Sequence, residues 1–283
     1  MTLTLSLLFA SPANAEIFSV GAIRGSENFD EQVRENCPWF FKDGEFHSQG
    51  INQYGYTGTC GEAALASALN HIFSTSYYTE NMILKTAVDY RFCTTEDPVK
   101  ENLGGMSPEN MMRVIALTNN TAAEEILKYP VTTTHIAETV FDSGLFPKSA
   151  YVCNNSVTLD EDEVTGVDAD LMLVNAVPDV EKMAEDIDNG YTYLECVCCC
   201  ILWGYDRSIV EAVGMQYVSS NHWIVVSNTI RDSKGELLGF YIIDSGKGEK
   251  LVDKNKMHEM IFGLPGEEVP DEACIRIRPI YGD

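Results

Sequence analysis

Apolar residues recur at helical spacing through the first half of the chain. The segment GTCGEAALASALNHIF predicts a turn and then a helix, because its alanines and leucines favour helix and supply an apolar face. A second helix is predicted in TENMILKTAVDYRFC, with Thr79 as its N-cap. After a break at Gly104 and Gly105, SPENMMRVIAL predicts a third helix, with Ser107 as cap and Pro108 at its first position.

The pattern changes in the second half. HIAETVFDSG and VEKMAEDIDNG predict two more helices, which end at Gly144 and Gly190. Between them, the acidic stretch near 153–170 lacks the ligand spacing of a calcium-binding loop, so we interpret it as a solvated insertion. Strands are predicted in four segments. Three are rich in β-branched and aromatic residues, YTYLECVCCCILW, NHWIVVSNTI and LLGFYIID, and in the fourth, CIRIRPI, apolar and basic residues alternate. Helices first and strands later indicate an α+β fold whose two halves pack against each other.

Composition narrows the classes of partner. A chain of 283 residues suits one domain with a sizeable core. Its formal net charge of −24 argues against nucleic-acid binding, because phosphate backbones would be repelled. The charge fits a solvated surface, and it is also compatible with basic partners or basic substrate segments.

The N-terminal segment bears on localisation. It has an apolar stretch followed by Ala13-Asn14-Ala15, which has the small-residue form of a signal-peptidase site, but no Lys or Arg precedes Arg24. We interpret residues 1–15 as a possible signal segment of an exported protein; the alternative is an ordinary buried strand or helix in a cytoplasmic one. No other apolar run has the length needed to cross a bilayer, so stable membrane insertion is not expected.

Four of the nine cysteines crowd into ECVCCCILW: Cys196, Cys198, Cys199 and Cys200. A metal site usually leaves a gap between ligands, as in C-x-x-C, and this run offers neither a gap nor a nearby His. Free Cys behaves as a small buried hydrophobe, so we predict that the run lies on a core strand.

Cys60 has the surroundings of a reactive thiol. Gly58 and Gly61 flank it in a turn, and a predicted helix starts immediately after it. A helix N-terminus lowers the pKa of a thiol, and the glycines allow the backbone of a substrate to approach. The alternative is an inert buried thiol.

His222 and Asp244 lie on two strands that a tight turn would join. Folding the chain at Asp232–Gly235 makes Arg231 face Glu236, and in that register His222 falls opposite Ser245, beside Asp244. An imidazole and a carboxylate at the same end of one sheet are what a general base and its orienting group require. The histidines at 47, 71, 135 and 258 have surroundings typical of surface or core residues.

An amide side chain precedes Cys60 in NQYGYTGTC. Acyl transfer needs donors aimed at the developing oxyanion, commonly a backbone N–H together with a side-chain amide. Gln53 is the candidate for the amide and Cys60 for the N–H, and Asn52 beside Gln53 could serve equally.

Four stretches together, INQYGYTGTCGEAALASAL, GGMSPENMMRVIAL, NHWIVVSN and GFYIIDSGKG, resemble the papain-like cysteine peptidases. The similarity is to the branch related to bacterial double-glycine leader peptidases, and it covers these four short stretches only. It implies a papain-like fold over 16–283, with a helical N-terminal half packed on a mostly antiparallel C-terminal sheet. It also implies that Gln53 is an oxyanion donor, Cys60 the nucleophile, His222 the base and Asp244 the orienting carboxylate. The sequence departs from that branch in two places. Gln53 lies seven residues before Cys60, a slightly long spacing, and Asp-Ser-Gly stands where that branch often has Asp-Pro.

The chemistry expected from these residues is attack by a thiolate on an amide carbonyl, giving a thioester that water hydrolyses. The expected substrate is a protein or peptide, and the first expectation is a cysteine peptidase that needs no cofactor. The alternatives are a glutamine deamidase or transglutaminase-like effector with the same triad, and a catalytically inactive papain-like binding module.

Overall fold

The computed structural model describes residues 52–73, 77–93, 103–126, 151–153, 164–173, 176–219, 221–267, 269 and 272–281. The described helices are α2 (Cys60–Phe73), α3 (Glu80–Asp89), α4 (Pro108–Ile126), α5 (Val180–Asp188), α6 (Cys199–Trp203), α7 (Arg207–Ala212) and α8 (Lys254–Phe262). The described strands are β1 (Tyr151–Cys153), β2 (Val164–Leu173), β3 (Thr192–Val197), β4 (His222–Arg231), β5 (Leu237–Asp244), β6 (Gly248–Asp253) and β7 (Ala273–Tyr281).

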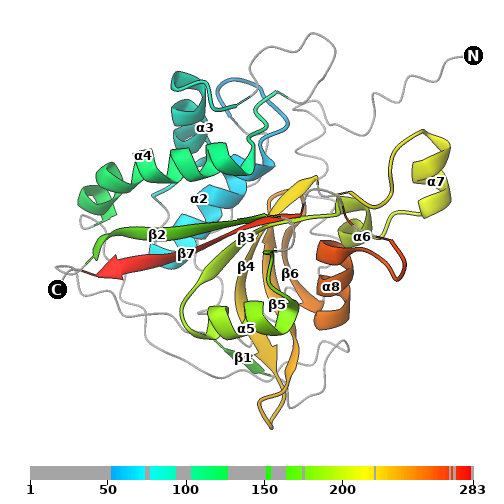
Figure 1. Cartoon of the computed structure of the whole chain (residues 1–283). Coiled ribbons are helices and arrows are strands. Elements are labelled where there is room, and N and C mark those ends of the chain that lie inside the picture. The colour runs from blue at the N-terminus through cyan, green and yellow to red at the C-terminus, as the bar shows by residue number, and fades with distance from the viewer. Residues whose placement is uncertain are drawn as a thin grey trace, which may run out of the picture.

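The strands form one antiparallel sheet in the order β2-β7-β3-β4-β5-β6, and β1 pairs with the far end of β4. Helices cover both faces: α2, α3 and α4 lie on one side of the sheet, and α5 and α8 on the other (Figure 1). The protein is therefore α+β, as the order of helices and strands predicted.

Alternation along the central strand β4 builds a core on each face of the sheet. Trp223 and Val225 pack with the apolar residues of α2, α3 and α4. Ile224 and Val226 pack with those of α5, α6 and α8. Because successive strand residues point to opposite faces, a strand covered on both sides is buried at nearly every position, as β4 is.

The helices predicted in the first half are present with their predicted caps. The Thr79 hydroxyl accepts the N–H of Met82 at 3.3 Å at the start of α3. The Ser107 hydroxyl accepts the N–H of Asn110 at 3.3 Å, and α4 begins at Pro108. The helix predicted to end near Gly190 is α5.

The prediction of an acidic loop is wrong for residues 164–170, which form most of β2. The acidic residues there stand directly opposite basic residues of β7: Asp168 faces Arg278 and Asp170 faces Arg276. Both pairs form ion pairs, with N–O distances of 3.3 and 2.9 Å. Cross-strand charge pairing explains why a strand can carry this charge.

The prediction that the cysteine run lies on one strand is also wrong. Strand β3 ends at Val197, so only Cys196 belongs to it, and α6 begins at Cys199. Cys198 is the N-cap of α6, and its thiol donates to the carbonyl of Tyr217 at 2.9 Å. An apolar run can continue through a change from strand to helix when both elements enter the same core, and periodicity over four residues does not separate the two.

Other expectations fall outside the described residues: the signal segment at 1–15 and the helix predicted at 135–144. Within the part of the chain that the structure describes, no helix combines the length and the apolar character needed to span a bilayer.

Candidate active site

Cys60 is the first residue of α2 and is partly exposed. The carbonyl of Thr59, just before it, accepts the N–H of Ala63 at 3.0 Å and so starts the helix. The loop is held from the other side, because the N–H of Gly58 donates to the carbonyl of Leu103 at 3.0 Å. These bonds fix the backbone immediately before the thiol.

Gly104 is the residue that permits this close packing. Its φ is +104°, and a Cβ built on it would lie 2.5 Å from Cγ2 of Thr59. Any larger residue would therefore push against the residue that precedes Cys60. At Gly105 the nearest atom to a built Cβ is the carbonyl oxygen of Gly58 at 3.8 Å, an ordinary contact. Gly104, rather than Gly105, is thus part of the support for the Cys60 loop.

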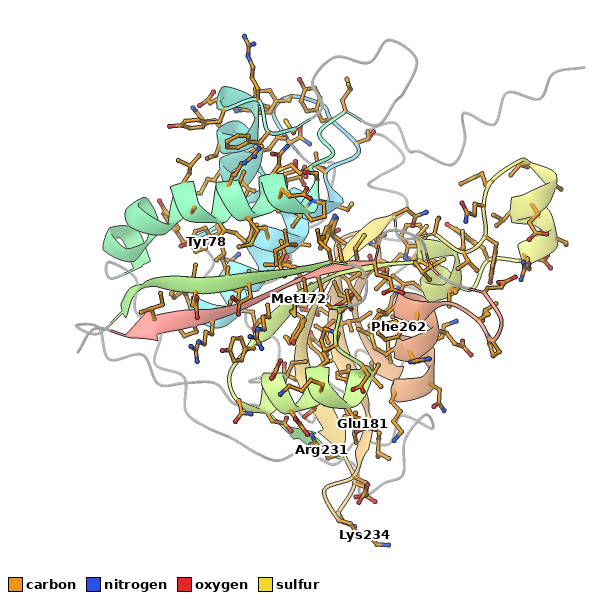
Figure 2. The ribbon with its side chains drawn as sticks, in the orientation of Figure 1. Tyr78, Met172, Glu181, Arg231, Lys234 and Phe262 are labelled. Carbon is orange, nitrogen blue, oxygen red and sulfur yellow. The ribbon has the colours of Figure 1, made fainter. Side chains whose placement is uncertain are left out.

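The hairpin between β4 and β5 brings His222 and Asp244 together in a register that differs from the predicted one. Arg231 pairs with Leu237 rather than facing Glu236, so the turn is one residue longer than predicted. Figure 2 shows Lys234 at its tip and Arg231 beside α5. Further along, Ser227 and Leu238 are each left without a strand partner, one bulge in each strand.

This shift decides which face Asp244 occupies. Asp244 pairs with Ile224, whose side chain lies on the same face of the sheet as that of His222 two residues earlier. His222 and Asp244 are therefore diagonal neighbours on one face, and Nε2 of His222 lies 2.8 Å from Oδ1 of Asp244. The predicted register, with His222 opposite Ser245, would have turned Asp244 to the other face.

Asp244 is fully buried, and both of its carboxylate oxygens are hydrogen-bonded. Besides His222, Oδ1 accepts the N–H of Gly246 at 2.8 Å. Oδ2 accepts hydrogen bonds from Nε1 of Trp203 at 2.8 Å and from Nζ of Lys250 at 3.0 Å. Burial alone would raise the pKa of Asp244, but the cationic neighbours and these donors hold it well below its usual range.

His222 lies between Asp244 and Cys60. Because Nε2 faces Asp244, Nδ1 is the nitrogen left to hydrogen-bond the Cys60 thiol. Burial alone would lower the pKa of His222, but the Asp244 carboxylate and Cys60 raise it to about 10. Burial alone would raise the pKa of Cys60, but His222 and the N–H groups of Trp223 and Gly61 lower it. The two shifts favour a thiolate–imidazolium pair.

Trp203 contacts both His222 and Asp244, and the sequence did not predict it. Its ring centroid lies 5.1 Å from that of His222, in addition to its hydrogen bond to Asp244. Nζ of Lys247 lies 4.9 Å from the centre of the Trp203 ring and 5.3 Å from that of Tyr205. Trp203 ends α6, and no sequence spacing links it to Asp244, 41 residues away.

Glu62 is a second carboxyl close to Cys60. It lies in the first turn of α2 and is fully buried. Burial raises its pKa well above the usual range, and Cys60 and Glu80 act in the same direction. A neutral Glu62 adds no negative charge beside the thiolate, so it is compatible with a lowered pKa at Cys60.

The two candidate amides have different surroundings. Asn52 is hydrogen-bonded within its own loop and to α3. Its NH₂ donates to the carbonyl of Tyr56 and to Glu80 of α3, and its oxygen accepts hydrogen bonds from the N–H groups of Tyr54 and Tyr56. These bonds make Asn52 an organiser of the turn rather than an oxyanion donor. Gln53 is exposed, and its backbone N–H donates to Asn81 at 2.7 Å. Its role stays a prediction.

Comparison with known families finds no family model that matches the chain, and comparison with curated proteins finds no match.

Proposed function

We propose that this protein is a cysteine hydrolase, with a peptidase as the first expectation, in which Cys60 is the nucleophile, His222 the base and Asp244 its orienting carboxylate. The observation that carries the proposal is the continuous hydrogen-bonded row from Asp244 through His222 to a thiol at the N-terminus of a helix. A helix-borne thiol facing an antiparallel sheet is also the arrangement expected of a papain-like fold in the double-glycine leader peptidase-like branch.

The first half of the reaction makes a thioester. The Cys60 thiolate attacks the carbonyl carbon of an amide, and the electron pair of the C=O bond moves to the oxygen. The N–H of Cys60 and the amide of Gln53 are the proposed donors to that oxyanion. The intermediate collapses, the C–N bond breaks, and the leaving amine takes the proton of the His222 imidazolium.

The second half releases the acid. Neutral His222 removes a proton from water, and the resulting hydroxide attacks the thioester carbonyl. The C–S bond then breaks, which returns the thiolate of Cys60 beside the imidazolium of His222. Asp244 stays ionised throughout and holds the ring with Nδ1 toward the sulfur.

The test is turnover of a peptide mixture and of a glutamine-containing peptide by wild type and by Cys60→Ala. Cys199→Ala is the matched control, because Cys199 is also a partly exposed free thiol but its pKa is raised by burial. We expect products with wild type and Cys199→Ala and none with Cys60→Ala. New peptide termini indicate a peptidase, and release of ammonia from the glutamine side chain indicates a deamidase. Equal product formation by Cys60→Ala would overturn the nucleophile assignment. Tight capture of a peptide that neither protein converts would instead favour an inactive binding module.

A further inference from the structure

Asp244 has a second cationic partner besides His222. The triad uses Oδ1, and Oδ2 of the same buried carboxylate lies 3.0 Å from Nζ of Lys250 and 2.8 Å from Nε1 of Trp203. The side chain of Lys250 is 23% exposed, whereas that of Asp244 is fully buried. A lysine beside the orienting carboxylate changes the charge balance of the whole group.

The register of three neighbouring strands explains the contact. Lys250 of β6 pairs with Ile242, which lies two residues before Asp244 on β5 and on the same face. Asp244 in turn pairs with Ile224, two residues after His222 on β4. The three polar side chains therefore follow one diagonal across β4, β5 and β6, with Asp244 in the middle.

The charges along this diagonal affect how firmly His222 holds its proton. Asp244 alone stabilises the imidazolium strongly. That attraction helps to form the thiolate–imidazolium pair. It also makes His222 slower to give its proton to a leaving amine, and it disfavours the neutral imidazole that must remove a proton from water when the thioester is hydrolysed. A fixed positive charge on the far oxygen of Asp244 offsets part of the attraction.

We propose that Lys250 is a positioning residue of the proposed hydrolase, which acts through Asp244 to keep His222 able to release its proton within the working pH range. This role rests on the proposed function. Lys250 holds the second oxygen of Asp244 and supplies the counter-charge.

Other charged and titratable groups face the same pair and stay constant in the test. Cys60 faces His222 from α2, and Tyr205 lies near Asp244 after the end of α6. Lys247, in the turn between β5 and β6, lies over the rings of Trp203 and Tyr205. Its pKa is lowered by burial and by Lys250.

The experiment measures the rate of alkylation of Cys60 by iodoacetamide from pH 4 to 11, because this readout needs no substrate. The rate should rise in two steps, first when the ion pair forms and again when His222 loses its proton. The variants are Lys250→Met, Lys250→Arg and Lys234→Met. Lys234 is the matched control, because it is an exposed lysine at the tip of the hairpin and its removal changes the net charge equally. A thermal melt of each variant checks the fold.

We expect both steps to move upward by about one pH unit in Lys250→Met, since loss of a nearby positive charge raises the pKa of both groups. Lys250→Arg should restore the wild-type profile, and Lys234→Met should not move it. If the pH profiles of the alkylation rate coincide for wild type and Lys250→Met, this role is overturned while the proposed function stands. The same holds if the profile of Lys250→Arg moves as far as that of Lys250→Met. If the alkylation rate of wild type shows no rise below the pH at which an ordinary thiol ionises, the proposed function fails, and the role of Lys250 fails with it.

Discussion

Removing the charge of Asp244 should release His222 from its raised pKa. Asp244→Asn keeps the shape of the side chain, and its amide oxygen can still accept a hydrogen bond from Trp203. Two unit charges 4 Å apart at an effective dielectric of about 20 interact by about 4 kcal/mol, which equals about three pKa units. The pKa of His222, about 10 in the wild type, should therefore fall to about 7.

The assay is a titration of histidine ring protons by NMR. The chain has five histidines, so comparison with His222→Gln assigns the resonance of interest. Asp168→Asn is the control, because it removes an equal charge from a surface ion pair with Arg278. A His222 resonance that titrates at the same pH in wild type and in Asp244→Asn would show that Asp244 does not raise the pKa of His222. A shift of the same size in Asp168→Asn would show that net charge, rather than the contact, is responsible.

Three further outcomes are expected. Gly104→Ala should cost about 1–3 kcal/mol in urea unfolding and lower turnover strongly, because its φ is +104° and a Cβ would clash with Thr59, the residue before Cys60. Gly105→Ala, with nothing closer than 3.8 Å to a built Cβ, should remain near wild type, and equal costs of the two substitutions would contradict this packing. Gln53→Ala should lower turnover by roughly a hundredfold with an unchanged melt if it supplies an oxyanion donor, and a normal rate would remove that role. Asp186→Ala should cost about 2–3 kcal/mol in urea unfolding, since its nearly buried carboxylate bonds a tyrosine hydroxyl, an arginine and a lysine. Asp168→Ala removes an exposed ion pair and should cost less than about 1 kcal/mol; the reverse order of the two costs would contradict the role of burial.

The helices of the first half could be predicted because their signals are local. Thr79, Ser107 and Pro108 act within one turn of their own positions, so the sequence alone specifies the starts of α3 and α4. The helix after Cys60 was predictable for the same reason. Caps and first-turn residues can therefore be predicted without knowing which elements the helix packs against.

Strand register and long-range pairing were harder to predict from the sequence. The single-residue shift in the hairpin depends on turn length, which no short motif specifies, because the bulges at Ser227 and Leu238 lie one in each strand and cancel. The prediction nevertheless chose the correct two strands, because the turn residues at 232–235 stand between them in the sequence. The acidic stretch at 164–170 became a strand because β7 presents arginines opposite it, a partner more than a hundred residues away.

The site was predictable only in part for similar reasons. Cys60, His222 and Asp244 stand next to recognisable features: a glycine turn, the start of a strand and the end of a strand. Trp203 and Lys250 contact Asp244 through the arrangement of α6 and β6, and neither element was predicted. Partners of a buried carboxylate follow from the tertiary fold, although burial itself requires that such partners exist.

The proposed hydrolase requires that His222 hold Cys60 as a thiolate. The most direct measurement is brief labelling with a limiting amount of iodoacetamide at pH 6, followed by mass spectrometry to locate the label among the cysteines. We predict that the label appears first on Cys60 and that His222→Gln removes this preference. Cys199 should lag far behind, because burial raises its pKa. Labelling of Cys60 no faster than Cys199, or unchanged labelling in His222→Gln, would contradict the account.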